Sequence, residues 1–476
     1  MIPRSWPSAA AATGAPSAAF RALVALLFVL VAAACGAPVP PTAPVAPRVA
    51  PARTAAAAPR AGAIRAGTSG DYPPLSKWSG EKPEGFAPAL LEAFAQSDGH
   101  DVAWTRFKWP DLVADVRAGR FDVAADGITV RPERSIAGRF TVPIARGGAV
   151  LLVRRPAWAG APSALAKNGA DTTVTARAAL APFDRAEFRV VVNRGGHLER
   201  VARSLFRAAT VTTLPENSAV RDALANGQAD AVMTNTFEAP RWAEGLTGIE
   251  RIGPLTNDTT ALWVGAEREE LAERLDSWLL AEEESGRLGA LRSSLLGPGG
   301  GGPSARAIDA LLAATAERLA LMPFVAAAKL RAKKAVEDTK QEERVIAAGT
   351  NAVAKAAVAR GAAPPPRERI VAFFRAQIEA AKAVQARISP PVTPAAPGSA
   401  TATPDAPAFT LEELRDAIAR ITARMAFLLV RVAPSPPAGA SARAAVMARA
   451  RADLADTQLD AAQIDALATT LAALTE

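Results

Sequence analysis

Asp126-Gly-Ile-Thr-Val-Arg-Pro-Glu-Arg134 follows directly on the apolar segment Phe121-Asp-Val-Ala-Ala125. The apolar segment has the composition of a buried β-strand, so the polar stretch begins where that strand ends. In proteins with parallel sheets, ligands bind at the carboxyl ends of strands and near the N-termini of helices. The stretch therefore predicts an α/β fold with a ligand site at this edge of the sheet.

Strand-like and helix-like segments alternate on both sides of this stretch. Apolar residues recur at helical spacing in 86–97, and the segment 68–74 is rich in turn-forming residues. Further strands are predicted at 63–67, 102–105, 189–192 and 231–233, and further helices at 109–117 and from 198 onward. The alternation predicts mainly parallel sheets.

Breakers and low-complexity segments divide the 476-residue chain, which is long enough for two or three domains. Residues 36–61 are rich in Pro and Ala and predict an extended tether, and 297–303 is a Gly/Pro linker. Two folded regions remain, at 62–296 and 304–476.

Residues 1–35 have the character of an export signal. The apolar run 22–31 is shorter than the about 20 residues that span a bilayer, and small residues follow it. Ala32-Ala-Ala-Cys35-Gly36 resembles a bacterial lipoprotein signal, except that Ala32 stands where leucine is usual. Cleavage without lipid and membrane anchoring through Cys35 both stay open, and both predict export to the periplasm.

The composition excludes several classes of site. The chain has 21% charged residues, a net charge of +8, 5% aromatic residues and no dense Lys/Arg run, which argues against nucleic acid as a partner. One cysteine and two histidines exclude an internal disulfide and a Cys/His zinc cluster. We expect no metal and no cofactor, and the positive balance suits small organic anions.

Three strand-end segments carry a family resemblance: Gly67-Thr-Ser-Gly-Asp-Tyr72, the stretch 126–134, and Asn193-Arg-Gly-Gly-His-Leu-Glu199. In this order and spacing they resemble the bacterial periplasmic binding proteins for polar amino acids, solute-binding protein family 3. Within that family they are most similar to cyclohexadienyl dehydratases, which convert prephenate or arogenate to phenylpyruvate or phenylalanine. The resemblance implies a two-lobed α/β clamshell over 62–296, in which 158–185 has no counterpart.

The resemblance also implies a carboxylate-binding cleft between the lobes. The residues it assigns to binding are Tyr72, Trp109, Thr129, Arg134, Gly195, Gly196 and Asn235. The guanidinium of Arg134 matches the planar geometry of a carboxylate, and Gly195 and Gly196 precede a helix, whose N-terminal N–H groups bind anions. Asn235 stands where relatives have an Asp that pairs with a ligand's ammonium group. Prephenate, which has no amine, is therefore expected over arogenate.

Glu199 occupies the place that the resemblance gives to the proton donor. Loss of the prephenate hydroxyl requires an acid, because hydroxide is a poor leaving group. A carboxyl group with this task should be buried, since burial raises its pKa. Glutamate is also favoured in the first turn of a helix for structural reasons, and binding proteins without activity carry it there too, so a receptor role stays open.

Residues 304–476 show helical periodicity throughout. Ile308, Leu312 and Leu319 recur on one face of a helix that Pro323 is expected to break. Further helices are predicted at 337–360, 367–387, 410–431, 440–453 and 459–475. The region therefore predicts an all-α bundle.

Ala316-Glu-Arg-Leu-Ala-Leu-Met-Pro-Phe-Val-Ala-Ala-Ala-Lys329 resembles the secreted, all-helical class of chorismate mutase, as do 336–339, 374–385 and 414–425. This enzyme rearranges chorismate to prephenate without a cofactor. Its catalysis depends on positioning and on positive charge at the breaking ether bond.

The resemblance to the mutase assigns roles to polar residues on different helices. Arg318 and Arg415 are expected to bind carboxylates, and Lys329 and Gln385 to donate to the ether oxygen. One position departs from the class, because Gln341 stands where an arginine is expected. Lys340 as the replacement stays open.

The two halves together predict a bifunctional periplasmic enzyme of phenylalanine biosynthesis, which makes prephenate from chorismate and phenylpyruvate from prephenate. One alternative is a mutase fused to a non-catalytic receptor for an amino acid or a keto acid. Another is a degenerate helical half that serves to form a homodimer.

Overall fold

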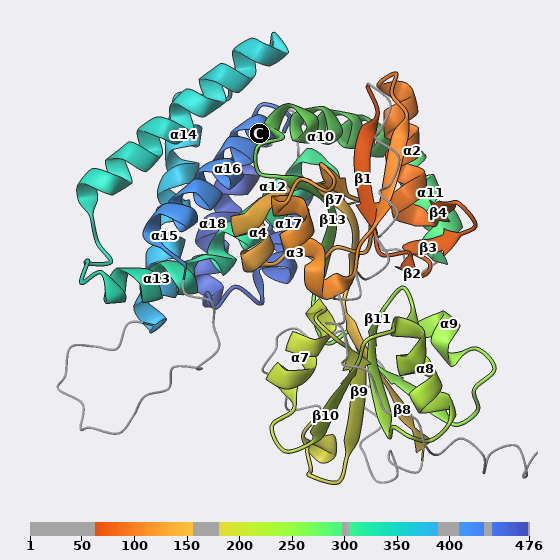
Figure 1. The fold of residues 1–476 in the computed structure, drawn as a ribbon. Helices are drawn as coiled ribbons and strands as arrows, with labels where there is room; N and C mark the ends of the chain where they lie inside the picture. Colours follow the sequence, from red (N-terminus) through yellow and green to blue (C-terminus); the bar gives the residue numbers. More distant parts are fainter. Residues whose placement is uncertain are drawn as a thin grey trace, which may run out of the picture. The chain divides into compact units, whose positions relative to one another are not determined.

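The computed structural model describes residues 62–155, 180–297, 302, 304–388, 409–432 and 440–474. The predicted signal peptide with Cys35, the tether and most of the 158–185 insertion lie outside these residues. Two α/β lobes are followed by an all-helical region (Figure 1). The predicted fold class is thereby confirmed.

Lobe 1 is a mixed sheet with helices packed on it, formed by 62–147 and 258–296. Its elements are β1 (Ile64–Thr68), β2 (Asp71–Tyr72), β3 (Ser76–Ser79), β4 (Lys82–Glu84), α2 (Phe86–Ser97), β5 (Val102–Arg106), η1 (Trp109–Asp111), α3 (Leu112–Arg117), β6 (Val123–Ala124), α4 (Pro132–Ala137), β7 (Gly138–Gly147), β13 (Asp258–Gly265), α10 (Glu269–Glu284) and α11 (Arg287–Leu296). The main sheet has the order β5-β1-β6-β13-β7, with β1 parallel to β5 and β6. The segment 68–74, expected as a turn, also contributes β2 to a small sheet with β3 and β4.

Lobe 2 contains the second five-stranded sheet, in the order β10-β9-β11-β8-β12. Its elements are β8 (Ala149–Arg154), η3 (Ala181–Phe183), β9 (Arg189–Asn193), α7 (His197–Leu205), β10 (Thr210–Leu214), α8 (Asn217–Ala225), β11 (Ala231–Asn235), α9 (Ala239–Ala243) and β12 (Ile249–Ile252). All five residues of β11 are buried, as are four of the five in β9, because helices cover both faces of the sheet. The parallel pairs β9–β10 and β9–β11 bring strand ends with polar residues to one edge.

Two chain crossings connect the lobes, one between β7 and β8 and one between β12 and β13. The crossings pack against each other so closely that a Cβ atom on Gly148 would collide with the carbonyl oxygen of Thr256. Glycine is required here for the close approach, and the paired crossings form the hinge between the lobes.

The helical region agrees closely with the helices predicted from periodicity. Its elements are α12 (Ala307–Ala320), α13 (Met322–Arg331), α14 (Thr339–Arg360), α15 (Arg367–Ile388), α16 (Leu411–Leu429), α17 (Ala440–Leu454) and α18 (Ala461–Ala473). The expected break at Pro323 is present, because α12 ends before it and Pro323 lies in the first turn of α13. Among the described residues, Ala307–Arg331 is long and apolar enough to cross a membrane, but 67% of its most apolar window is buried, as in a core helix.

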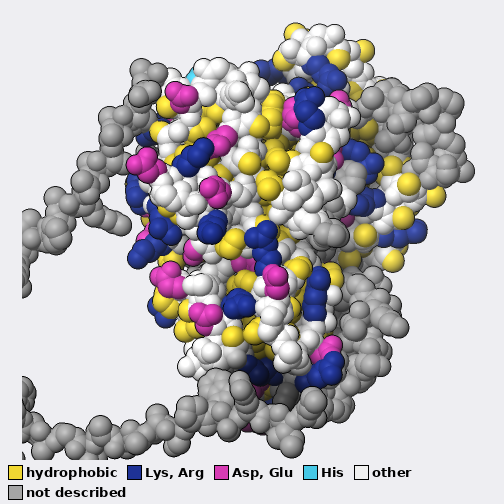
Figure 2. All heavy atoms as spheres, turned by 90° about the vertical axis from the view of Figure 1, so that its right-hand side faces the viewer, with side chains coloured by type: hydrophobic (Ala, Val, Ile, Leu, Met, Phe, Trp, Pro, Cys, Tyr) yellow, Lys and Arg dark blue, Asp and Glu magenta, His cyan; other side chains and the backbone are white. Residues whose placement is uncertain are grey.

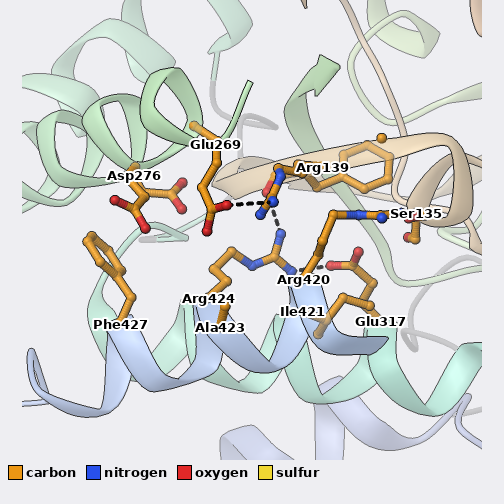
Figure 3. Close-up of a pocket in the computed structure, with 14 residues that line it drawn as sticks. Ser135, Arg139, Glu269, Asp276, Glu317, Arg420, Ile421, Ala423, Arg424 and Phe427 are labelled. Carbon is orange, nitrogen blue, oxygen red and sulfur yellow. Dashed lines mark hydrogen bonds and ion pairs between the residues drawn. The ribbon is translucent and has the colours of Figure 1, made fainter. Parts of the chain in front are cut away.

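Lobe 1 and the helical region share a continuous apolar core. At their contact, Arg420 and Arg424 of α16 donate to the carbonyl oxygens of Ile136 and Phe140. Arg424 also pairs with Glu317 of α12 (Figure 3), so arginines fill this contact and leave a cavity of only about 40 Å³. The contact is therefore structural. On the face shown in Figure 2, basic and acidic side chains are interspersed.

Candidate functional site

The cleft between the lobes encloses a cavity of about 30 Å³. It is lined by Tyr72, Trp109, Gly127, Thr129, Arg134, Asn193, Gly196, His197, Leu198 and Asp258. The lining includes five of the predicted clamshell residues, namely Tyr72, Trp109, Thr129, Arg134 and Gly196. They reach it from segments that follow β1, β5, β6 and β9, at the strand ends where the sequence predicted a ligand site.

Arg134 is a buried cation that has no carboxylate partner in the described part of the chain. The residue is 3% exposed, its Nη1 donates to the carbonyl oxygen of Thr129 at 2.9 Å, and its guanidinium lies 5.7 Å from the ring centroid of Trp109. Burial, aided by the charge of Arg131, lowers its pKa to about 9. The neighbouring Glu133 pairs with Arg131 and Arg200 instead. An unpaired guanidinium is costly to bury, so this position suits an anionic ligand.

Tyr72 and Asn235 meet across the cleft. The ring of Tyr72 packs edge-on against Trp109 with 5.7 Å between centroids, and its Oη accepts a hydrogen bond from Asn235 Nδ2. Asn235 Oδ1 accepts from the backbone N–H groups of Phe237 and Glu238, at 2.8 and 3.0 Å. Because the backbone holds Oδ1, the amide nitrogen of Asn235 faces Tyr72 as a donor.

The lobes are closed on each other in this structure. His197 Nε2 lies 3.0 Å from Asp258 Oδ1, and Arg200 Nη1 donates to Glu133 Oε1 at 2.5 Å, so both contacts join lobe 2 to lobe 1. Gly195 has φ +76°, and a Cβ there would lie 3.0 Å from Pro110 of the opposite lobe. A cavity of about 30 Å³ holds roughly one water molecule, so a ring-sized ligand requires the lobes to open.

A second cavity, of about 940 Å³, lies among α12, α13, α14, α15 and α16 of the helical region. All four predicted mutase residues line it, namely Arg318, Lys329, Gln385 and Arg415. Six basic and four acidic side chains contribute to its lining, which leaves an excess of positive charge. The cavity is large enough for a drug-sized ligand and its charge suits a dianion.

The four predicted residues differ in how firmly the helices hold them. Arg318 is 6% exposed and donates to the carbonyl oxygen of Gln377 at 3.1 Å, and burial lowers its pKa to about 10. Lys329 Nζ donates to the carbonyl oxygen of Val336 at 2.8 Å, and burial lowers its pKa. Gln385 Nε2 donates to the carbonyl oxygen of Ala381 at 3.2 Å, whereas its buried Oε1 has no partner among the described residues. Arg415 is exposed at the rim.

Residues 64–297 match the family of bacterial extracellular solute-binding proteins, family 3. This segment is a domain of that family. It is related to the cyclohexadienyl dehydratase of Pseudomonas aeruginosa, with 28% identity over 232 residues, which are 48% of this chain and 80% of the relative. A probable histidine-binding protein of Campylobacter jejuni is 26% identical over 80 residues, 17% of this chain and 31% of that protein.

Two solved structures resemble the family 3 domain. An ancestral amino acid-binding protein, a precursor of cyclohexadienyl dehydratase, is 22% identical, with a TM-score of 0.43, over 50% of this chain and 96% of its own. An ancestral cyclohexadienyl dehydratase is 28% identical, with a TM-score of 0.30, over 50% and 93% of the two chains.

Glu199, the predicted proton donor, lies in the first turn of α7 in the family 3 domain. Its Oε2 accepts from the backbone N–H of Gly195 at 2.8 Å, and its Oε1 accepts from Arg203 Nε at 3.0 Å. Glu199 is not among the residues that line the cleft cavity. Both carboxylate oxygens are therefore engaged within lobe 2.

Glu238 is an acid that sequence reasoning did not single out. It is fully buried and follows β11, where Oε1 accepts from Asn217 Nδ2 at 2.6 Å and Oε2 from Thr234 Oγ1 at 2.8 Å. Its Oε2 also lies 3.4 Å from Asn235 Nδ2, next to the contact with Tyr72. Burial raises its pKa to about 8. Like Glu199, Glu238 is not among the residues that line the cleft cavity, and it lies behind Asn235.

No group of three or more His, Cys, Asp and Glu side chains that could hold a metal ion occurs in the described part of the chain.

Asp126 is a second buried acid of the family 3 domain. It accepts hydrogen bonds from Thr68, Ser69, Ser76 and Gly127, and burial raises its pKa. Its bonds hold the loop before Tyr72 in place, so it supports the cleft wall.

Proposed function

We propose that this protein is an exported bifunctional enzyme, which converts chorismate to prephenate in the helical cavity and prephenate to phenylpyruvate in the cleft. The strongest support is that Arg318, Lys329, Gln385 and Arg415, assigned from separate segments of sequence, line one cavity. The similarity of the family 3 domain to a cyclohexadienyl dehydratase supports the second reaction. The product of the first reaction is the substrate of the second, which explains why one chain carries both.

The first reaction is a rearrangement within a single molecule. The C–O bond of the enolpyruvyl ether breaks while a C–C bond forms, so no proton, nucleophile or cofactor is consumed. Arg318 and Arg415 bind the two carboxylates and hold the reactive conformer. Lys329 and Gln385 donate to the ether oxygen, which gains negative charge in the transition state. An amide donor such as Gln385 works at any pH.

The second reaction consumes one proton and releases carbon dioxide and water as the ring becomes aromatic. Arg134 and Thr129 bind a carboxylate of prephenate, and an acid protonates the departing hydroxyl. Glu238 is one candidate for this task because burial raises its pKa to about 8, although, like Glu199, it does not line the closed cavity. Glu199 remains a second candidate, although Arg203 and the Gly195 N–H already engage its carboxylate.

A receptor function for the family 3 domain is the alternative. It is favoured by the engaged carboxylate of Glu199 and by the similarity to a probable histidine-binding protein. In that case the protein is a mutase fused to a sensor of an amino acid or keto acid. The family's extracellular description supports export in both cases.

Incubation of the purified protein with prephenate at neutral pH tests the second reaction. The proposal predicts catalytic release of phenylpyruvate, followed by its absorbance in alkali, because an acid must deliver a proton for each turnover. Binding of prephenate without release of phenylpyruvate identifies the receptor instead.

A further inference from the structure

The helical cavity has Gln341 at the position where the resemblance to the mutase implies an arginine. Gln341 lies in the first turn of α14, where its backbone N–H donates to the capping carboxylate of Asp338 at 3.0 Å, and its side chain lines the cavity. A neutral amide cannot balance the charge of a carboxylate. A carboxylate bound near Gln341 therefore needs a positive charge from another side chain.

Arg344 lies one turn further along α14 and also lines the cavity. Its Nη1 donates to Gln341 Oε1 at 3.1 Å. Side chains on a helix lean toward its N-terminus, so a long side chain covers the surface of the preceding turn. The guanidinium of Arg344 therefore lies beside the side chain of Gln341. An arginine at position 341 would place its charge in the same region of the cavity.

Lys340 and Lys382 are excluded by position or by existing partners, whereas Lys334 remains as a second cation on the cavity lining. Lys340 is exposed and is not part of the cavity lining. Lys382 pairs with Glu379 at 2.8 Å and with Glu342 at 3.4 Å. Among the described residues, the guanidinium of Arg344 has Gln341 as its one hydrogen-bond partner, which leaves most of its donors available to a ligand.

We infer that Arg344 binds one of the two carboxylates of the cavity's substrate, and that Gln341 holds its guanidinium in place. The inference rests on the proposed mutase function. Arg318 is buried deep between α12 and α15, whereas Arg344 lies at the exposed rim. Arg318 would bind one carboxylate of the substrate, and Arg344 would bind the other together with Arg415 of α16, which lines the same cavity.

Steady-state kinetics of Arg344→Ala with chorismate test the inference, with Lys340→Ala as the matched control. Loss of a charge-assisted bond to a carboxylate should raise KM about 10- to 100-fold. Lys340→Ala should behave like the parent. The double variant Gln341→Arg/Arg344→Ala, which returns the guanidinium to the preceding turn, should regain most of the lost affinity. A structural effect would not be rescued in this way.

An unchanged KM in Arg344→Ala, with an active parent, overturns the inference and leaves the proposed mutase intact. A parent that does not convert chorismate contradicts the proposed function itself. Calorimetry with a bicyclic dicarboxylate ether, which mimics the transition state of the rearrangement, then tests Arg344 separately. Weaker binding by Arg344→Ala than by the parent upholds the inference, whereas equal binding, or binding by neither, overturns it. Retained activity on prephenate shows that the variant is folded.

Discussion

Glu199 and Glu238 are both acids that follow strand ends of lobe 2, but their surroundings differ. Glu238 is enclosed among Asn217, Thr234 and Asn235, and burial raises its pKa to about 8. Glu199 is held by Arg203 and a backbone N–H. An acid that protonates a leaving group at neutral pH needs a raised pKa, and the enclosed surroundings of Glu238 provide one.

Replacement of each acid by its amide should show which of the two, Glu238 or Glu199, donates the proton to prephenate. We expect Glu238→Gln to lower kcat for prephenate about 10²–10⁴-fold, because an amide cannot deliver the proton. The matched variant Glu199→Gln should retain most of the activity. Prephenate binding, measured by calorimetry, should persist in both, since Arg134 is untouched. A large loss in Glu199→Gln with a fully active Glu238→Gln would return the role to Glu199.

The pH dependence of prephenate turnover should follow the titration of Glu238. Burial raises the pKa of Glu238 to about 8, so the group is protonated below that pH and ionised above it. Because the protonated form is the active one, kcat should be constant near neutrality and fall as the pH rises through about 8. A kcat that is independent of pH up to 9 would contradict this role.

Asn235 should control the choice between prephenate and arogenate. Its amide donates to Tyr72 Oη and carries no charge to pair with an ammonium group. Asn235→Asp should shift the ratio of kcat/KM values toward arogenate by about tenfold, the value of one charged hydrogen bond. Competition assays with both substrates measure this ratio. An unchanged ratio would show that another residue discriminates.

Arg134 and Thr129 could be predicted as cleft residues because their motif follows a buried strand and the family resemblance assigns both residues to binding. Glu238 was not predicted as a candidate because its burial depends on contacts with Asn217 and Asn235, which come from different elements. The one sequence feature that pointed to Glu238 was its position three residues after Asn235. Spacing alone does not reveal which of two acids is enclosed.

At the scale of elements, helices were easier to predict than short strands. The predicted helix at 410–431 corresponds to α16, whose start is set by a capping box between Thr410 and Glu413. By contrast, β2 and the ten-residue β7 were not predicted. β7 contains Pro143 and a register shift opposite it, which interrupt the alternation that identifies strands.

The bend between α12 and α13 places Arg318 and Lys329 in one cavity. Lys329→Ala should abolish mutase activity and leave prephenate dehydration intact, because a donor to the ether oxygen acts only in the first reaction. Lys333→Ala, an exposed lysine just beyond α13, is the matched control and should change neither. Separate assays with chorismate and prephenate measure the two rates. Loss of both activities in a folded Lys329→Ala variant would contradict the assignment of two separate sites.

At the scale of the molecule, lobe 1 and the helical region are joined by arginines that meet backbone carbonyl groups. Arg420 and Arg424 of α16 donate to carbonyl oxygens of 136 and 140, and Arg146 of β7 pairs with Asp453 of α17 at 2.7 Å. No sequence pattern predicts this contact, because surface arginines on a helix are ordinarily solvated. The order of the two folded regions, by contrast, was evident from the change in periodicity.

We propose that one chain carries out two consecutive reactions. The most direct measurement follows chorismate, prephenate and phenylpyruvate together by chromatography after the purified protein is mixed with chorismate at neutral pH. We expect chorismate to disappear, prephenate to rise transiently and phenylpyruvate to accumulate in stoichiometric amount. Accumulation of prephenate without phenylpyruvate, or chorismate that remains unchanged, would contradict the claim.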